Sequence, residues 1–171
     1  MLNTKPLPFR VAWALFSLQR VILVMVPSPT TKVGLRSEQI TRRLLAKEGI
    51  NAQTGWNAYG LGRVVRLDLV DVEKRNIYEV KTGPVFHIVG STATRLDQAE
   101  RQAALIGKSV RLKNFRTRDE ITQFLVSSVT WISVGAEGKA GFGPKAAERL
   151  SALGIMMRTL GSRQLSFNNG L

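Results

Sequence analysis

RLDLVDVEKRNIYEVKTG, residues 66–83, holds two runs of strand-forming residues on either side of a short polar spacer. The first run extends over Val64–Val72 and the second over Ile77–Val80, and both are rich in branched or aromatic side chains. The four residues EKRN between the runs have the composition of a turn. We therefore expect a β-hairpin in this part of the chain.

Charged side chains occupy the hairpin in an unusual pattern. In an extended strand every second side chain points to the same face, so Glu79 and Lys81 share a face. The same rule puts Asp68 and Asp71 on opposite faces of the first strand. If the two strands pair, Asp68 can lie beside Glu79 and Lys81, which gathers two carboxylates and an ammonium in one small patch.

Two carboxylates side by side on a sheet repel each other and destabilise it. A divalent cation removes this repulsion, because it binds both groups, and it also polarises a phosphoryl oxygen and lowers the pKa of a coordinated water. Lys81 can orient that water or stabilise charge on the transferring phosphate. The pattern favours phosphodiester hydrolysis at this patch, and the alternative is a solvated strand face.

The same residues resemble the signature of the PD-(D/E)XK nuclease superfamily, which has a carboxylate at a strand end, a short spacer and a Glu-x-Lys strand. Asp68 stands at the first carboxylate, with leucine replacing the usual proline before it, and EVK forms the Glu-x-Lys element. The resemblance implies a Mg²⁺ (or Mn²⁺) site made by Asp68, Glu79 and the Val80 backbone carbonyl. It also implies that Lys81 assists the attacking water.

Flanking residues extend the resemblance over about residues 34–106. Glu38, in a helix before the strands, matches the acidic residue that many members of the superfamily carry there. Gln98, or else Gln102, matches the glutamine often found in the helix after Glu-x-Lys. The fold that this implies is a restriction-endonuclease-like core, in which helices flank a central mixed sheet.

The remaining periodicity agrees with a mixed α/β (α+β) domain. Ser37 is expected to be the N-cap of the first helix. The elements expected around the hairpin are, in order, a helix over Ser37–Glu48, a polar and irregular stretch over Asn51–Gly62, a helix over Arg95–Ile106, a strand within residues 109–115, a short helix over Thr117–Leu125, a strand over Val129–Val134 and a glycine turn leading into a helix within Gly141–Gly154.

The segment Phe9–Val26 is almost wholly apolar, although Arg10, Gln19 and Arg20 interrupt it. A transmembrane helix needs about 20 apolar residues with few or no charges, so a packed core element is favoured here. A remnant of a preceding trafficking region and a membrane segment are the alternatives, and membrane association stays open. We expect residues 1–33 to form this segment and a linker, and residues 34–171 to form the nuclease domain with a basic C-terminal extension.

The formal net charge is +13, from 25 Lys and Arg against 12 Asp and Glu, which suggests a polyanionic partner. The chain has no cysteine and one histidine, His87, which excludes thiolate zinc sites and histidine-rich metal sites. A metal here would be held mainly by oxygens, which suits Mg²⁺ or Mn²⁺. The residues expected to contact nucleic acid are Lys108, Arg111, Lys113, Arg116 and, beside the glycine turn, Lys145.

Together these features predict a metal-dependent endonuclease that acts on DNA in preference to RNA and uses no small-molecule cofactor. A small nuclease domain behind an apolar segment resembles the toxin domains of polymorphic and contact-dependent effectors. That resemblance implies a secreted antibacterial toxin, active in the cytoplasm of a target cell, with an acidic immunity protein as partner. The alternatives are a non-catalytic nucleic-acid-binding protein and an RNase of the same fold.

Overall fold

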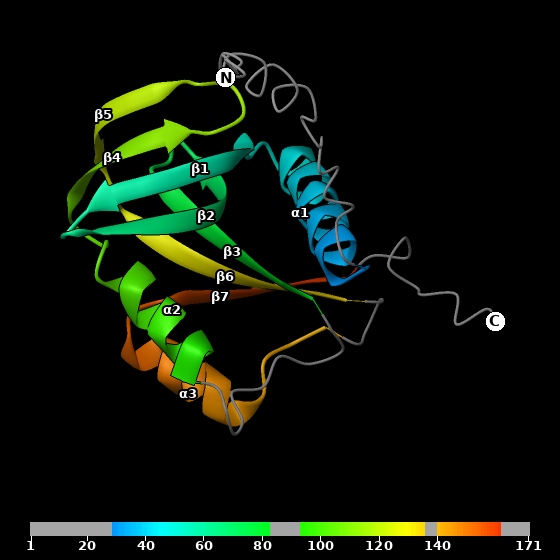
Figure 1. Cartoon of the computed structure of the whole chain (residues 1–171). Helices are drawn as coiled ribbons and strands as arrows, with labels where there is room; N and C mark the ends of the chain where they lie inside the picture. The colour runs from blue at the N-terminus through cyan, green and yellow to red at the C-terminus, as the bar shows by residue number, and fades with distance from the viewer. Residues whose placement is uncertain (1–28, 83–92, 136–139, 162–171) are drawn as a thin grey trace, which may run out of the picture.

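The structure is a computed structural model that describes residues 29–82, 93–135 and 140–161. These residues contain three helices and seven strands, and the strands form one sheet (Figure 1). In chain order the elements are α1 (Pro29–Lys47), β1 (Ala52–Gly60), β2 (Arg63–Asp71), β3 (Asn76–Thr82), α2 (Ala93–Ala103), β4 (Ser109–Asn114), β5 (Glu120–Leu125), β6 (Ser128–Gly135), α3 (Pro144–Ala152) and β7 (Met156–Gly161).

The strand order in the sheet is β5-β4-β1-β2-β3-β6-β7. Antiparallel pairing joins the strands from β5 to β3, whereas β3, β6 and β7 run parallel to one another. A helix lies in each parallel connection, α2 between β3 and β6 and α3 between β6 and β7, because parallel neighbours need a crossover. The expected α/β (α+β) architecture, a mixed sheet flanked by helices, is therefore confirmed, as is the β2–β3 hairpin.

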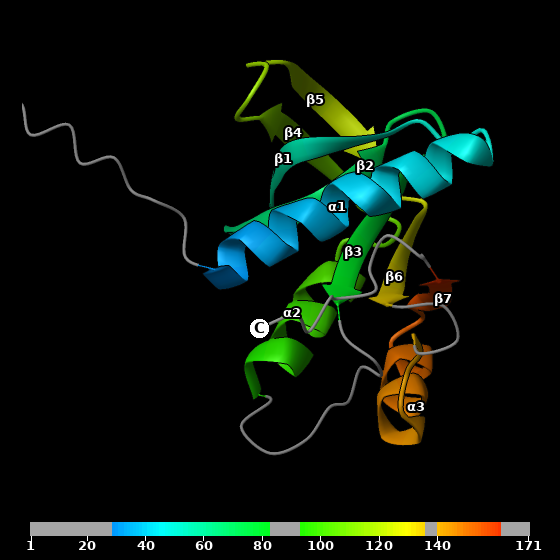
Figure 2. The ribbon, with the colours of Figure 1, turned by 90° about the vertical axis from the view of Figure 1, so that its right-hand side faces the viewer.

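One face of the sheet is covered by α1, which crosses it in Figure 2. Ile40 and Leu45 of α1 are buried together with Leu69 of β2 and Ile132 of β6. Burial of an aliphatic side chain of this size stabilises the fold by about 1.5–3 kcal/mol. Packing on these strands fixes α1 beside the middle of the sheet.

The other face is covered by α2 and α3 (Figures 1 and 2). Ala99 of α2 and Leu150 of α3 belong to one buried cluster with Val70, Ile77 and Trp131 of the sheet. The same cluster continues under β1 and β4. The two helical layers thus meet the sheet from opposite sides, and β2 and β3 lie between them.

Side-chain alternation is interrupted in β2 at Asp68. Leu67 packs in the cluster on the α2 side, whereas Leu69, two residues later, packs in the cluster under α1. In a regular strand these two side chains would share a face. On the neighbouring strand the residue at this level is Gly55, which has a φ of +89° in the left-handed half of the backbone map. Beyond the irregularity, Leu69 therefore faces α1, whereas Val65 and Leu67 before it face α2.

Gly55→Ala is expected to lower the free energy of unfolding by about 1–3 kcal/mol, measured by urea denaturation. A Cβ at this position would lie 2.9 Å from Asn114 Oδ1, and a positive φ strains any side chain. Gly49→Ala is the matched control, because Gly49 also has a positive φ but nothing within 4 Å of its added Cβ. Equal losses in the two variants would show that the close approach to β4 contributes nothing.

The predicted N-cap at Ser37 is wrong. The helix begins at Pro29, eight residues earlier, and Ser37 is 1% exposed inside it. Proline suits the first turn of a helix because its missing N–H has no partner there in any case. The expected boundary between residues 33 and 34 therefore falls within α1.

Two further expectations of local structure are wrong, and one strand was not predicted. Asn51–Gly62 was expected to be irregular, but most of it is the central strand β1. Thr117–Leu125 was expected to be helical, but Glu120–Leu125 is strand β5. The apolar Ile121 and Phe124 are three residues apart, which is a helical spacing. Both nevertheless pack against the same core, because the β4–β5 pairing shifts register between their partners. The last strand, β7, had no predicted counterpart.

Two features of the sequence, the apolar segment Phe9–Val26 and the single His87, lie outside the described residues. Within residues 29–82, 93–135 and 140–161, no helix is both long and apolar enough to cross a membrane. The expected helices at Arg95–Ile106 and after the glycine turn are present as α2 and α3, and the expected strands are present as β4 and β6.

Candidate active site

The candidate site lies where β2 and β3 separate. Their ladder runs from Asp71↔Asn76 to Leu69↔Tyr78, and the next two residues in this register are Asp68 and Glu79. There the Val80 N–H donates to Asp68 Oδ2 at 2.9 Å. The aspartate side chain thus binds the β3 backbone at the point where the ladder ends, which brings it beside Glu79.

Glu79 is 3% exposed, so this part of β3 is not a solvated strand face. Its Oε1 accepts hydrogen bonds from Lys81 Nζ at 2.6 Å and from Gln98 Nε2 at 2.7 Å. Its Oε2 accepts one from Gln102 Nε2 at 2.7 Å. A buried carboxylate is stable only when such donors replace its lost water. Both glutamines come from α2, so this helix positions Glu79.

Lys81 is held on the same face of β3 as Glu79. Besides its bond to the glutamate, its Nζ donates to Gln98 Oε1 at 2.8 Å and lies 4.6 Å from the centroid of the Trp131 ring. A cation over an indole face is stabilised by the negative potential of the ring. These three contacts fix the ammonium beside the carboxylates, and the side chain remains 16% exposed.

Trp131 also fixes Gln102, because its Nε1 donates to Gln102 Oε1 at 2.8 Å. Trp131 and Gln102 are both fully buried. The chain of bonds from the indole through the amide to Glu79 satisfies every polar group on the way. The sequence predicted Gln98 or else Gln102, and the structure brings both of them to the glutamate.

Trp131 was not predicted as a site residue. It lies directly beside Glu79 in the parallel β3–β6 register. The sequence placed it on a strand, but nothing in the sequence indicates that β6 pairs with β3, because that pairing spans a crossover. An aromatic residue in a predicted strand more often belongs to the core, and Trp131 belongs to the core as well as to the site.

Burial, together with the negative charge of Glu79, raises the pKa of Asp68 from 3.8 to about 7. The charge of Glu38 raises it further, whereas the Val80 N–H and the Lys81 ammonium act in the opposite direction. A carboxyl that still binds a proton near neutral pH has lost water around its ionised form and has gained too little positive charge in exchange. A cation bound beside Asp68 and Glu79 would supply that charge.

Glu38 reaches the same region from α1. Burial raises the pKa of its carboxyl, the charges of Arg66 and Arg116 lower it, and the charge of Glu79 raises it again. These couplings place Glu38 near both the carboxylate pair and two arginines. The predicted acidic residue before the strands thus lies on the α1 side of the site, opposite the glutamines of α2.

The donor set fits Mg²⁺ better than a metal that needs a full protein cage. In the described part of the chain no three or more histidine or carboxylate side chains are gathered as ligands. Magnesium is commonly bound by one or two carboxylates while it keeps several waters. Asp68 and Glu79 would supply these oxygens, and Glu79 would have to exchange a hydrogen bond to do so. Ligation by the Val80 carbonyl stays a prediction.

Asp71, the other acidic residue of β2, has a different role. It is 1% exposed, and its Oδ1 accepts the Lys74 N–H at 3.0 Å in the turn before β3. Its negative charge raises the pKa of Tyr78, for which burial is the largest cause. Since Val70 packs on the α2 side and Tyr78 belongs to the core under α1, Asp71 is directed towards the α1 side, beyond the irregularity at Asp68.

Three of the predicted nucleic-acid contacts lie on or beside β4. Arg111 and Lys113 are exposed and alternate with buried Val110 and Leu112. They therefore project from the side of the sheet on which α1 lies. The guanidinium of Arg111 lies 5.0 Å from the centroid of the Tyr59 ring on β1.

Arg116 continues this surface towards the site. Its guanidinium lies 5.7 Å from the ring centroid of Phe115, and Arg66 of β2 lies 5.6 Å from the same ring. The positive charges of both arginines also lower the pKa of Glu38. The two arginines and the exposed ring thus connect this side of β4 to the carboxylates.

The other two predicted contacts lie outside β4. Lys108 is exposed just before β4 begins, and Lys145 is exposed in the first turn of α3. Figures 1 and 2 show α3 in the layer below the sheet, far from β4. The five basic residues therefore do not form one patch.

Comparisons of the chain with protein-family models, with curated proteins and with solved structures find no match. The interpretation of this site therefore depends on its geometry and its chemistry. The resemblance to the PD-(D/E)XK superfamily accordingly stays a prediction from residues 66–83 and their flanking helices.

Proposed function

We propose that this protein is a Mg²⁺-dependent nuclease that hydrolyses phosphodiester bonds beside Asp68, Glu79 and Lys81. One observation carries the proposal. Glu79 is a buried carboxylate held by an ammonium and two amides, and beside it lies a second carboxylate whose pKa is raised to about 7. Such perturbed groups are concentrated at functional sites.

Four side chains of the site would have separate roles in the reaction. Asp68 and Glu79 would hold the ion, which when bound supplies a Lewis acid for the phosphodiester. Lys81 would stabilise the negative charge that develops on the phosphate, because a fixed ammonium needs no reorganisation during the reaction. Gln98 would keep that ammonium in place, since its amide bonds both Lys81 and Glu79.

The surface supports nucleic acid as the substrate. The net charge of +13 favours a polyanion, and Arg111, Lys113 and Arg116 lie on or beside β4, on a surface that reaches the site through Arg66. Exposed Phe115 can stack on a base. An endonuclease acting on DNA in preference to RNA stays part of the proposal.

The biological setting is also a proposal. A nuclease domain of this charge would suit an antibacterial toxin that is delivered into the cytoplasm of a target cell. An acidic immunity protein would be attracted to the same basic surface, which speeds association and fixes orientation. Binding of such a partner over β4 would cover Arg111 and Lys113 and so inhibit cleavage.

Purified protein is expected to cleave plasmid DNA when Mg²⁺ or Mn²⁺ is present and to leave it intact in EDTA. The assay should include linear DNA and tRNA, because they separate endonuclease from exonuclease and DNase from RNase. Glu73→Gln, at an exposed acid in the β2–β3 turn, is the control that should cleave like the wild type. If none of these substrates is cut although all are bound, the protein is a nucleic-acid-binding protein without catalysis.

A further inference from the structure

Two clefts follow one another between β2 and α2. The first, of about 270 Å³, is lined by Gln98 of the candidate active site together with Arg66, Val65 and Arg101. The second, of about 300 Å³, lies towards the β1–β2 turn and shares Val65 and Arg101 with the first. The two clefts therefore form one groove that leads away from the active site.

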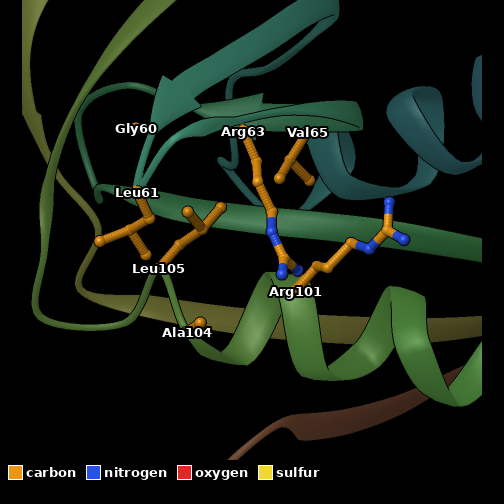
Figure 3. A pocket seen from close by; sticks show the side chains of 7 residues that line it. All are labelled: Gly60, Leu61, Arg63, Val65, Arg101, Ala104 and Leu105. Atoms are coloured by element: carbon orange, nitrogen blue, oxygen red, sulfur yellow. The ribbon is translucent and has the colours of Figure 1, made fainter.

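The far cleft combines positive charge with an apolar lining (Figure 3). Arg63 extends from β2 towards Arg101 on α2, while Leu61 and Leu105 approach each other at the other end. Guanidinium groups bind phosphate through paired N–H donors. Apolar side chains such as Leu61, which is 57% exposed, offer a base a surface to cover. This is the chemistry of one nucleotide, phosphate at one end and base at the other.

The size of the far cleft favours an unpaired strand. A cleft of about 300 Å³ is at the small end of ligand sites. In a duplex the bases stay stacked and paired, whereas a single strand can turn a base into a cleft. A base can therefore enter beside Leu61 only where the nucleic acid is unpaired.

We infer that the cleft formed by Leu61, Arg63, Arg101 and Leu105 is a subsite for one nucleotide of a single strand whose scissile phosphodiester lies at Asp68 and Glu79. The inference rests on the proposed function and specifies its substrate as single-stranded or locally unpaired nucleic acid. Arg63 carries most of the phosphate affinity, because Arg101 also forms an ion pair with Asp97.

The test measures binding of a short fluorescent single-stranded oligonucleotide in EDTA, where no cleavage occurs. Arg63→Gln is expected to weaken binding about five- to ten-fold and to reduce the slope of log affinity against log salt by about 0.7, the value for one lost phosphate contact. Lys74→Gln is the matched control, because Lys74 is exposed in the β2–β3 turn, at the opposite end of β2 from Arg63. It should change binding less than about two-fold.

A second variant tests the base contact. Leu61 has a φ of +51°, and asparagine tolerates a positive φ well, so Leu61→Asn should fold. It is expected to weaken single-strand binding about three-fold or more without changing the salt slope, because it removes no charge. Binding of the same sequence as a duplex should be unchanged by Leu61→Asn.

Three outcomes would overturn the subsite. They are equal losses in Arg63→Gln and Lys74→Gln, equal losses for duplex and single strand, and displacement of the oligonucleotide by polyglutamate at equal charge concentration, which would assign the groove to an acidic protein. A different result would refute the proposed function. Wild-type protein that cuts nothing with Mg²⁺ would refute the nuclease, whereas normal cleavage with unaltered binding by Arg63→Gln would refute the subsite alone.

Discussion

Lys81→Met is expected to lower the cleavage rate about 10²–10³-fold, the usual cost of losing one preorganised charge at a transition state. Methionine is unbranched and only one atom shorter than lysine, and its thioether packs well on the Trp131 ring that lies under the ammonium. Glu79 retains the donors of Gln98 and Gln102, so the protein should stay folded. The measurement is the single-turnover rate of plasmid cleavage with saturating Mg²⁺.

Lys74→Met is the control for this change, because Lys74 is an exposed lysine of the β2–β3 turn. It should cleave at the wild-type rate. Both variants should bind single-stranded oligonucleotide in EDTA within about two-fold of the wild type, since Lys81 is already paired with Glu79 and Lys74 lies in a turn outside the groove. Cleavage by Lys81→Met within about ten-fold of the wild type would remove this amine from the chemistry.

Asp68→Asn is expected to stabilise the metal-free protein at about pH 8 by up to about 4 kcal/mol, because the pKa of Asp68 is raised from 3.8 to about 7 and each pH unit corresponds to 1.36 kcal/mol. A raised pKa means that the folded state holds the proton longer than the unfolded state. The stability from this group is fully present below about pH 3.8 and is lost as the pH rises through about 7. Asparagine stays neutral and can still accept the Val80 N–H.

The two proteins should therefore be almost equally stable at about pH 4 and differ most at about pH 8, as measured by urea unfolding in EDTA. Adding Mg²⁺ at about pH 8 should stabilise the wild type and leave Asp68→Asn unchanged, because ligand binding to the folded state adds to its stability. Glu73→Gln, an exposed acid, should behave like the wild type throughout. An Asp68→Asn protein that is less stable than the wild type at about pH 8 without metal would contradict this account.

Much of the site could be predicted because its signal is local. Glu79 and Lys81 share a face through simple strand alternation, and the glutamines lie one helical turn apart on the next helix. The hairpin joins Asp68 to them over a turn of four residues. Each of these relations spans few residues, so the chain itself reveals it.

The parts that could not be predicted depend on distant pairing. Trp131 lies beside Glu79 only because β6 pairs in parallel with β3, and no local pattern in the sequence predicts that pairing. Ile121 and Phe124 have the spacing of a helix, and only the register shift against β4 lets both face one core from a strand. The helix start at Pro29 was missed because Ser37 has the chemistry of a cap but is buried inside the helix.

Diffraction at the manganese edge from crystals soaked in Mn²⁺ tests the central claim most directly. We predict one strong anomalous peak in contact with carboxylate oxygens of both Asp68 and Glu79, at about 2.0–2.2 Å, the distance usual for a small hard cation. The peak should be absent in crystals of Asp68→Asn. A saturating soak in which the wild type shows no peak between these two carboxylates, or shows one held only by other residues, would contradict it.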